Sequence, residues 1–481
     1  MDAATKIIVT NYSAMQKKGY GQSALASVRA EVAKLVQADL GRGIATTVVD
    51  LSSGTDMAAY GASAVTSETD EKQNKDAVDA VFHSARPDYL MILGSYDVVP
   101  HQSLKNLAPD SDSSVPSDLP YACETTYDAG GGEPSRFTNP SRVVGRLPDV
   151  TGSHDPAYLT SLIAFSAAHT PAGLDAYQTY VGLSAAVWEK STRENLTTVF
   201  GGSSALHLVP PDGSPWSSSA LAGRSHFVNC HGASNDPQWY GQSGSNYPVA
   251  LKADDVDKPL TGGTILAAEC CYGAELYEPD AHTRMSICNT YLRSGAVVFF
   301  ASTNIAYGPA DYCDQADLIT QYAVREALKG RSSGYAVLKA RLDYVKRKTT
   351  LDAVDLKTLS QFILLGDPSL RPVQPPKPAA EGDAKAALTE RRREARRAAH
   401  VLEQSIYVPE PIPGSARSSE LESRLREIGE RHGLPPTATI SSFAGVWQGS
   451  GAMPRSSSRR RDSTCCTQNG TRRPPCARMS S

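Results

Sequence analysis

Short apolar runs alternate with amphipathic, helix-length stretches through the first 100 residues. They predict three strands and two helices, at residues 6–10, 24–40, 45–51, 71–83 and 88–93. Strands separated by helices usually pair in parallel through right-handed crossovers. Uninterrupted apolar runs such as Tyr89–Leu93 are typical of strands that are buried on both faces. The pattern therefore predicts a βαβαβ unit.

A second alternating block follows a polar segment, residues 102–140, that is rich in Pro, Ser, Asp and Gly. Its predicted strands lie at 142–147, 205–209, 226–229, 264–268 and 296–302. Its predicted helices lie at 156–169, 183–200, 284–293, 316–328, 334–346 and 356–364. Gly366 and Pro368 are expected to stop the last helix. Two consecutive blocks of this kind predict an α/β fold with two packed, mostly parallel sheets.

The composition changes after Pro372. The remaining chain has two helix-like stretches, at 390–404 and 420–432, and ends in a segment that is almost free of aliphatic residues. Such a segment cannot form a core and is expected to be disordered. We therefore expect an N-terminal α/β subdomain at 1–150, a second subdomain at 151–372 and a largely disordered tail at 373–481.

The formal net charge of −3 is unevenly distributed. Residues 373–481 hold 18 basic and 11 acidic side chains, whereas residues 1–372 hold 30 and 40. An acidic body argues against a nucleic-acid partner for the folded part. The longest apolar run, Ala296–Ala301, is far shorter than the roughly 18 residues that a membrane-spanning helix needs. We expect no contact with a membrane.

Two features of the sequence favour a cytoplasmic protein. The N-terminus lacks the charged start and apolar stretch that are typical of a secretory signal. The chain also has nine cysteines, an odd number at irregular spacing, which does not resemble a disulfide framework. We expect these thiols to be reduced.

Two predicted strands each end in a chemically reactive side chain. The first is followed by His231 and Gly232, and the second by Cys270 and Cys271. Ligands of open α/β sheets bind at the carboxyl ends of the strands. A thiolate there can attack a carbonyl, an imidazole can protonate the leaving amine, and backbone N–H groups can hold the oxyanion. Gly232 suits this chemistry because a residue without Cβ lets its N–H approach the reacting centre.

These strand-end motifs resemble the caspase-like cysteine peptidases, and most of all the gingipain (C25) family. Four further segments carry the resemblance in the same order: KIIVTNY, PDYLMILGSYDVVP, RVVGRLPDVTG and FILLGDPSLRP. The similar region covers about residues 5–372. The resemblance implies a caspase-like (caspase-hemoglobinase) fold and endopeptidase cleavage of a protein or peptide after a defined P1 side chain. It implies no cofactor for the chemistry.

The resemblance also implies roles for individual residues. His231 would be the proton donor. The pattern acidic-x-Cys-x-Gly selects Cys271 as the nucleophile, whereas a Cys-x-x-Gly spacing would select Cys270. The backbone N–H groups of Gly232 and Cys271 would form the oxyanion hole.

One position departs from the family's pattern. Gingipain-like sequences often place a His-orienting acid where this chain has Ser141. Glu124, Asp128 or Glu133 could replace that acid, or the site could work as a Cys/His dyad. The acidic residues of 106–140 are also candidates for a structural calcium ion, as in gingipains.

The P1 pocket is expected to form from the loop after strand 296–302, the loop after Gly145 and the segment between His231 and the cysteine pair. Trp239 lies in that last segment, and Asp149, Asp155 and Asp311 are candidate acids for pairing with a basic P1 residue. The acidic body slightly favours a basic P1. An arginine-directed enzyme would also find many sites in its own tail.

Two other function classes use the same residues. Cys230, His231, Cys270 and Cys271 could be zinc ligands, but neighbouring residues on a strand face opposite ways and neither pair has the usual ligand spacing. A silent caspase-like scaffold that only binds partners is the other alternative. Our interpretation remains a cysteine endopeptidase, as would suit a regulated processing enzyme in bacterial defence or signalling.

Overall fold

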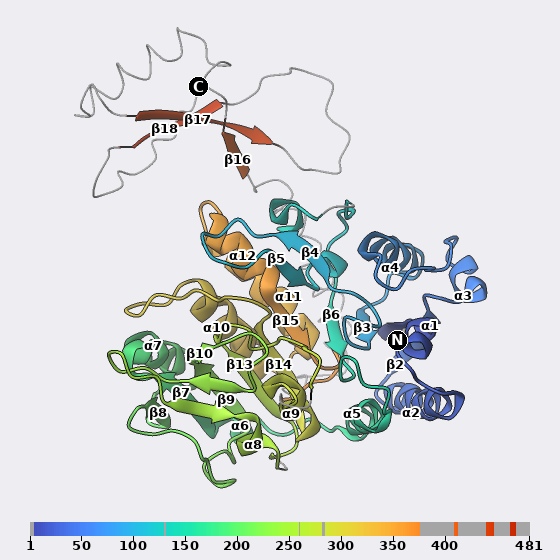
Figure 1. Ribbon diagram of the computed structural model, residues 1–481, viewed down its shortest axis with the longest axis horizontal. Coiled ribbons are helices and arrows are strands. Elements are labelled where there is room, and N and C mark those ends of the chain that lie inside the picture. Colours follow the sequence, from blue (N-terminus) through green and yellow to red (C-terminus); the bar gives the residue numbers. More distant parts are fainter. Residues whose placement is uncertain are drawn as a thin grey trace, which may run out of the picture. The chain divides into compact units, whose positions relative to one another are not determined.

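The computed structural model describes residues 4–128, 131–258, 260–280 and 284–375, together with three strands nearer the C-terminus. A ten-stranded sheet forms its centre, in the order β2-β1-β3-β6-β15-β14-β13-β9-β7-β8 (Figure 1). All neighbouring strands of this sheet pair in parallel except β14 and β15. The α/β fold with a mostly parallel sheet is confirmed, but one continuous sheet replaces the two that the sequence predicts.

The strands of this sheet are β1 (Ala4–Thr10), β2 (Ile44–Asp50), β3 (Tyr89–Leu93), β6 (Val144–Leu147), β7 (Tyr180–Ala185), β8 (Leu206–Val209), β9 (Ser225–Asn229), β13 (Thr264–Ala268), β14 (Ala296–Ser302) and β15 (Phe362–Leu365). Two smaller sheets contain β4 (Gln102–Lys105) with β5 (Ser114–Ser117), and β10 (His231–Gly232), β11 (Gln238–Tyr240) and β12 (Val249–Lys252).

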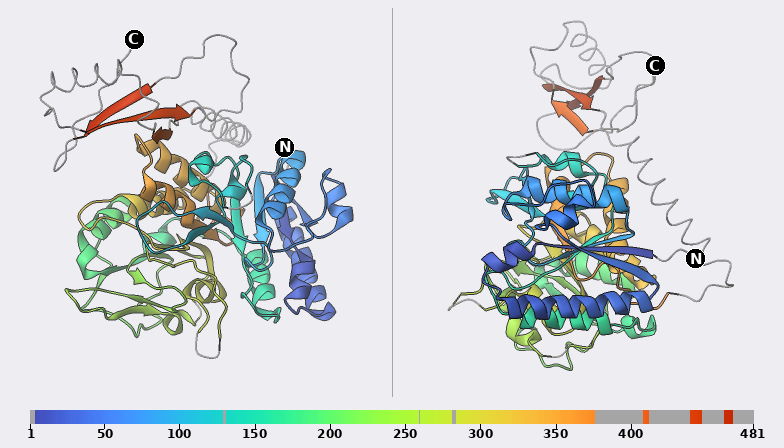
Figure 2. Two further views of the ribbon diagram at one scale, coloured as in Figure 1. Left: turned by 45° about the horizontal axis from the view of Figure 1, so that its top comes forward. Right: turned by 90° about the vertical axis from the view of Figure 1, so that its right-hand side faces the viewer.

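The helices are α1 (Tyr12–Lys17), α2 (Gln22–Gly41), α3 (Gly54–Ala58), α4 (Glu71–Ala85), α5 (Ala157–Ala168), α6 (Asp175–Gln178), α7 (Glu189–Phe200), α8 (Ala253–Val256), α9 (Ile287–Arg293), α10 (Gln315–Leu328), α11 (Ser333–Arg347) and α12 (Ala353–Gln361). Helix α5 packs between α2 and α9, whereas α10 packs against α7, α11 and α12. These two groups cover opposite faces of the sheet (Figure 2). No helix among the described residues is long and apolar enough to cross a membrane.

Two predicted helices are partly wrong. The sequence predicts a helix from residue 183, but residues 180–185 form strand β7 and α7 begins only at Glu189. It also predicts a helix to residue 364, but α12 ends at Gln361 and residues 362–365 form strand β15. Gly366 and Pro368 therefore follow a strand. A short apolar run cannot be assigned to helix or strand by periodicity alone, and here the pairing partners decide.

Strand β15 joins the two halves of the sheet. It pairs antiparallel with β14, and its other edge meets β6 through one residue pair, Leu365 and Arg146. The backbone N–H of Gly366 donates to the carbonyl of Arg146 at 2.7 Å. Strands formed by residues 4–147 and strands formed by residues 180–365 therefore belong to one sheet. The domain boundary at residue 150 stays a prediction.

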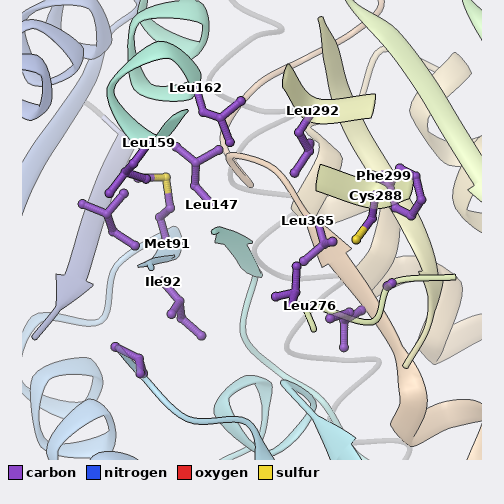
Figure 3. Close-up of a cluster of buried hydrophobic side chains, with 14 of the residues drawn as sticks. Met91, Ile92, Leu147, Leu159, Leu162, Leu276, Cys288, Leu292, Phe299 and Leu365 are labelled. Atoms are coloured by element: carbon purple, nitrogen blue, oxygen red, sulfur yellow. The ribbon is translucent and has the colours of Figure 1, made fainter. Parts of the chain in front are cut away.

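One apolar core spans both halves of this sheet. Figure 3 shows Met91, Leu147 and Leu159 from the first half in the same cluster as Phe299 and Leu365 from the second. All five side chains are at most 3% exposed. Burying a side chain of this size contributes about 1.5–3 kcal/mol, so the two halves stabilise each other.

Buried ion pairs lie on both sides of this junction. Arg146 is fully buried and donates to both carboxylate oxygens of Asp118, at 2.8 and 2.6 Å, and to the carbonyls of Gly94 and Val99. Lys6 in β1 is paired with Asp39 of α2 and with Asp367, directly after β15. Asp367 therefore anchors the chain after β15 to β1.

The C-terminal region contains strands β16 (Val408–Pro411), β17 (Thr439–Val446) and β18 (Asp462–Thr467), which form an antiparallel sheet. The composition did not predict these strands. The helix-like stretches at 390–404 and 420–432 lie outside the described residues.

The buried pair at the junction predicts that Arg146→Leu strongly destabilises the fold. The substitution leaves the Asp118 carboxylate buried without its bidentate partner, so we expect a loss of about 3–5 kcal/mol in the free energy of unfolding. Arg284→Leu is the matched control, because Arg284 pairs with Asp254 at the surface and its side chain is 71% exposed; we expect about 1 kcal/mol or less. Urea unfolding measures both, and equal effects would contradict the prediction.

The Arg146–Asp118 pair also makes the stability of the fold depend on pH. Burial, the largest single effect, would raise the pKa of Asp118, but the charges of Arg146 and His101 and the hydrogen bonds from both side chains together outweigh it and hold the pKa well below its usual range. Because the pKa of Asp118 is lower in the folded than in the unfolded chain, its carboxylate stabilises the fold fully at pH values above about 4, the unfolded pKa. This stabilisation is lost progressively as the pH falls from about 4 toward the pKa of the folded state.

Candidate active site

Strands β9 and β13 bring His231 and Cys271 to the same edge of the sheet. The strands are parallel neighbours, and Val228 pairs with Ala268. His231 and Cys271 each follow three residues after this pair, so they leave the sheet at the same level. The shared strand end that the sequence predicts is therefore present.

The backbone of Gly232 lies directly against the backbone of Cys271. A Cβ atom placed on Gly232 would be 2.0 Å from the Cys271 carbonyl oxygen and 3.4 Å from Cδ1 of Trp239. Carbon and oxygen atoms cannot approach to 2.0 Å without a bond, so only glycine fits here. The distance also shows that the His231–Gly232 segment and the Cys271 segment touch.

Burial distinguishes the neighbouring cysteines. Cys270 is 0% exposed and Cys230 is 1% exposed, whereas Cys271 is partly exposed. Cys270 also lies within the core cluster, and its carbonyl accepts a hydrogen bond from the Ser302 hydroxyl at 2.9 Å. A peptide carbonyl can therefore reach Cys271 but not the other two thiols.

The Cys271 thiol lies beside the loop that follows β14. The N–H of Ala306 points at its Sγ at 3.3 Å, and the Ala306 carbonyl oxygen is 3.7 Å from Sγ. Burial raises the pKa of the Cys271 thiol, and the Ala306 N–H opposes this rise. The raised pKa favours the protonated thiol, and the Ala306 N–H is placed to stabilise a negative charge on the sulfur once the proton is lost.

The loop that contains Cys271 is held in a strained conformation. Tyr272, directly after Cys271, has a φ of 55°, which residues with a side chain rarely adopt. Its N–H donates to the Asn304 carbonyl at 2.9 Å, and its hydroxyl donates to Asp112 at 2.6 Å. These contacts keep Cys271 at the strand end in spite of the strain.

A buried lysine connects this loop to the polar segment 102–140. The Lys357 ammonium of α12 lies 2.5 Å from Asp110 and 2.6 Å from Asp112. Asp110 also accepts from the Tyr307 hydroxyl, and Asp112 from the N–H of Ile305. The two acids thus contact both loops that surround Cys271, and the Lys357 charge offsets one of their two negative charges. No local pattern in the sequence predicts these contacts, because the residues that make them are far apart along the chain.

His231 is held by a side chain that the sequence analysis missed. Its Nε2 lies 2.7 Å from Oε1 of Gln242. Its ring also contacts Trp188 and Tyr247, with centroid distances of 4.3 and 5.3 Å. A short strand fixes its backbone, since His231 pairs with Tyr240 of β11. The ring is therefore restrained by one hydrogen bond and two aromatic contacts.

The three acids considered as partners of His231 lie elsewhere in the described structure. Asp128 pairs with Arg136, Glu133 pairs with Lys105, and Glu124 is exposed. The described partner of Nε2 is the neutral amide of Gln242.

The candidate P1 residues are also spread out. Trp239 is only 2% exposed and packs against Phe299, so it supports the site from within the core. Asp149 is buried and accepts from Lys18 and Tyr20. Asp155 accepts from the N–H of Ala157 near the start of α5, and Asp311 is exposed beside Lys190. Asp149 and Asp155 follow β6, which runs opposite to β13, so their loop leaves the sheet at the other end.

The acidic residue two positions before Cys271 points into the interior. Burial, and then the nearby Asp317, raise the pKa of Glu269 well above its usual range, and burial raises the pKa of Asp317 to about 7. The amide of Asn195 donates to both carboxyl groups. The pair therefore keeps a proton at neutral pH and ties β13 to helices α7 and α10.

No group of three or more His, Cys, Asp or Glu side chains within the described ranges is arranged to hold a metal ion. This applies to the four residues considered as zinc ligands. It also applies to Asp110 and Asp112, where the neighbouring charge is that of Lys357.

The contact at Gly232 predicts that Gly232→Ala disables the site. The new Cβ would overlap the Cys271 carbonyl, so one backbone must move by about 1 Å, which can cost about 100-fold in kcat/KM. Gly202→Ala is the control, because nothing lies within 4 Å of its added Cβ. Peptide hydrolysis and thermal unfolding are measured together, and an unchanged kcat/KM would contradict the prediction.

The burial of the thiols predicts selective alkylation of the native protein. Iodoacetamide should label Cys271 but not Cys230 or Cys270 until the chain is unfolded. The rate should rise with pH above the range of an ordinary thiol, because burial raises the pKa of Cys271. Peptide mapping by mass spectrometry measures this, with Cys271→Ser as the control. Labelling of Cys270 before Cys271 would contradict it.

Residues 225–373, which contain His231 and Cys271, match the peptidase family C25. A solved structure described as a protease has 13% identity and a TM-score of 0.49, and covers 78% of this chain and 82% of its own. The complex of pro- and mature domains of RgpB from Porphyromonas gingivalis has 11% identity and a TM-score of 0.48, and covers 76% and 79%. No curated protein matches the chain. The match to the model of peptidase family C25 therefore falls on the region that contains both strand-end motifs, as those motifs predict.

Proposed function

We propose that this protein is a cysteine endopeptidase with Cys271 as nucleophile and His231 as proton carrier. One observation carries the proposal: the backbones of Gly232 and Cys271 touch at the ends of neighbouring parallel strands, so that His231 and the partly exposed Cys271 lie at the same edge of the sheet. Acyl transfer to sulfur needs a thiol and a base that are close to each other, and this placement supports that chemistry.

The reaction has two halves. The Cys271 thiol gives its proton to His231, and the sulfur attacks the carbonyl carbon of the peptide. The carbon–nitrogen bond then breaks as His231 returns the proton to the leaving amine, which leaves a thioester. A water molecule attacks this thioester, gives one proton to His231 and releases the carboxylic acid, and His231 reprotonates the sulfur.

The backbone N–H groups of Gly232 and Cys271 are proposed as the oxyanion hole. The absence of a Cβ at residue 232 supports this, because the substrate carbonyl can then approach the backbone closely. The neutral partner of His231 favours a Cys/His dyad over a triad with Glu124, Asp128 or Glu133. A dyad is sufficient because a thiol needs less help than a serine to lose its proton.

We propose a basic P1 residue, supported by the acidic charge of residues 1–372. Asp311 is the remaining sequence candidate on the loop after β14, and its exposed side chain could pair with such a residue at the rim of the site. Self-cleavage in the arginine-rich region 373–481 follows from the same preference. If it occurs, the purified protein loses mass while the Cys271→Ala variant does not.

The cellular role is proposed as regulated processing in bacterial defence or signalling, in the cytoplasm. The six cysteines between residues 123 and 313 are all unpaired, which supports a reducing compartment. Calcium remains a proposed structural ion for the acidic segment 106–140. A binding scaffold without activity is the competing function, favoured only by the missing acid at Ser141.

A peptide library varied at P1 tests the activity directly. Wild type, Cys271→Ala and Cys270→Ala are incubated under reducing conditions with and without calcium, and the products are read by mass spectrometry. We expect wild type to cut after one residue class and Cys271→Ala to be inactive. Cys270→Ala is the control and should stay active because its side chain only packs in the core. Loss in Cys270→Ala alone would move the nucleophile, and no cleavage by wild type would favour the scaffold.

A further inference from the structure

We infer that Gln242 is the positioning residue for His231: its side-chain oxygen fixes the neutral ring with its proton on Nε2 and leaves Nδ1 to exchange the proton of Cys271. The catalytic role of Gln242 rests on the proposed function, because it requires that Cys271 and His231 cleave peptides. The position of the ring proton, however, can be measured whether or not the protein cleaves a peptide.

The hydrogen bonds of Gln242 determine which way its amide faces. Its Nε2 lies 3.0 Å from the Gly244 carbonyl oxygen and 3.0 Å from the Tyr247 hydroxyl. A carbonyl oxygen can only accept, so the atom that faces Gly244 must be the NH₂ group. The other end of the amide, Oε1, therefore faces His231.

This direction decides the tautomer of His231. Oε1 of Gln242 can only accept, and it lies 2.7 Å from Nε2 of His231. Nε2 must then carry a proton. A neutral imidazole has only one ring proton, so Nδ1 has a free lone pair. Among the described residues Nδ1 has no hydrogen-bond partner, and it is thus the nitrogen that is open to a proton from outside.

The backbone of Gln242 is itself held in place. Its N–H donates to the carbonyl of Val209 at the end of β8, and its carbonyl accepts from the N–H of Val187. Tyr247, which accepts from the amide, also packs on the His231 ring, and Trp188 packs on the ring from next to Val187. The amide and the ring are therefore positioned by the same two loops.

In the reaction the Sγ–H bond of Cys271 breaks as an Nδ1–H bond forms. Nε2 keeps its proton throughout and donates it to Oε1 in both charge states of the ring. A ring with its single proton on Nδ1 could not take the thiol proton at that atom. Gln242 therefore performs the orienting task with an oxygen that carries no full charge, in a chain that has Ser141 where related sequences often have an acid.

Nitrogen NMR of the full chain labelled with ¹⁵N-histidine tests the inference, with the His231 signals assigned by comparison with His231→Ala. Wild type should show the Nε2–H tautomer. Gln242→Leu, which fills similar space without an acceptor, should lose this preference. Gln242→Glu should keep it, because a carboxylate oxygen also accepts. Gln238→Leu is the control, since that glutamine of β11 has its side chain near Asp236 and not at His231.

Hydrolysis kinetics give the second readout, using the substrate that the peptide library identifies. Gln242→Leu should lower kcat by about 10- to 100-fold with little change in KM, a part of the 10²- to 10⁴-fold that general acid–base catalysis supplies, and Gln242→Glu should restore most of it. A proton on Nδ1 in wild type would overturn the inference even if Gln242→Leu does not fold. An unchanged tautomer or kcat in a folded Gln242→Leu would also overturn it. Absence of any cleavage would overturn the proposed function alone.

Discussion

The parallel pairing of β9 with β13 is the constraint on which the candidate site depends. It places residues 231 and 271 at one level of one edge, and the missing Cβ of Gly232 then lets the two backbones touch. A shift of either strand by one residue would turn its side chains to the other face of the sheet. The register of β9 and β13 therefore determines that His231 and Cys271 lie close together, and the surrounding loops determine only how their side chains are oriented.

Buried charges hold the elements that surround this edge. Lys357 pairs with Asp110 and Asp112, which bind the loop that contains Cys271 and the loop at residues 303–307. Arg146 and Lys6 do the same at the junction of the two sheet halves. Each of these cations has partners from distant parts of the chain. Buried ion pairs are costly to break from one side, so they specify which segments lie together.

Several predictions from the sequence differ from the structure because a residue that is distant along the chain decides the contact. The sequence offers either an acid among Glu124, Asp128 and Glu133 or no third residue beside His231, but the amide of Gln242 lies there. It offers Asp149 for substrate binding, but Lys18 and Tyr20 bind that carboxylate in the interior. It predicts the end of a helix at residues 362–365, but they form a strand that pairs on both edges and joins the two expected sheets into one. In each case the deciding group is far away in sequence.

The sequence by itself determined the α/β class, most element positions and the two strand ends that carry His231, Gly232 and Cys271. These features follow from local patterns: apolar periodicity, turn residues and motif spacing. Only the tertiary structure decided which cysteine is accessible, what orients the histidine and how the halves join. Burial, hydrogen-bond direction and edge pairing are properties of neighbours in space, and the chain brings those neighbours together only when it folds.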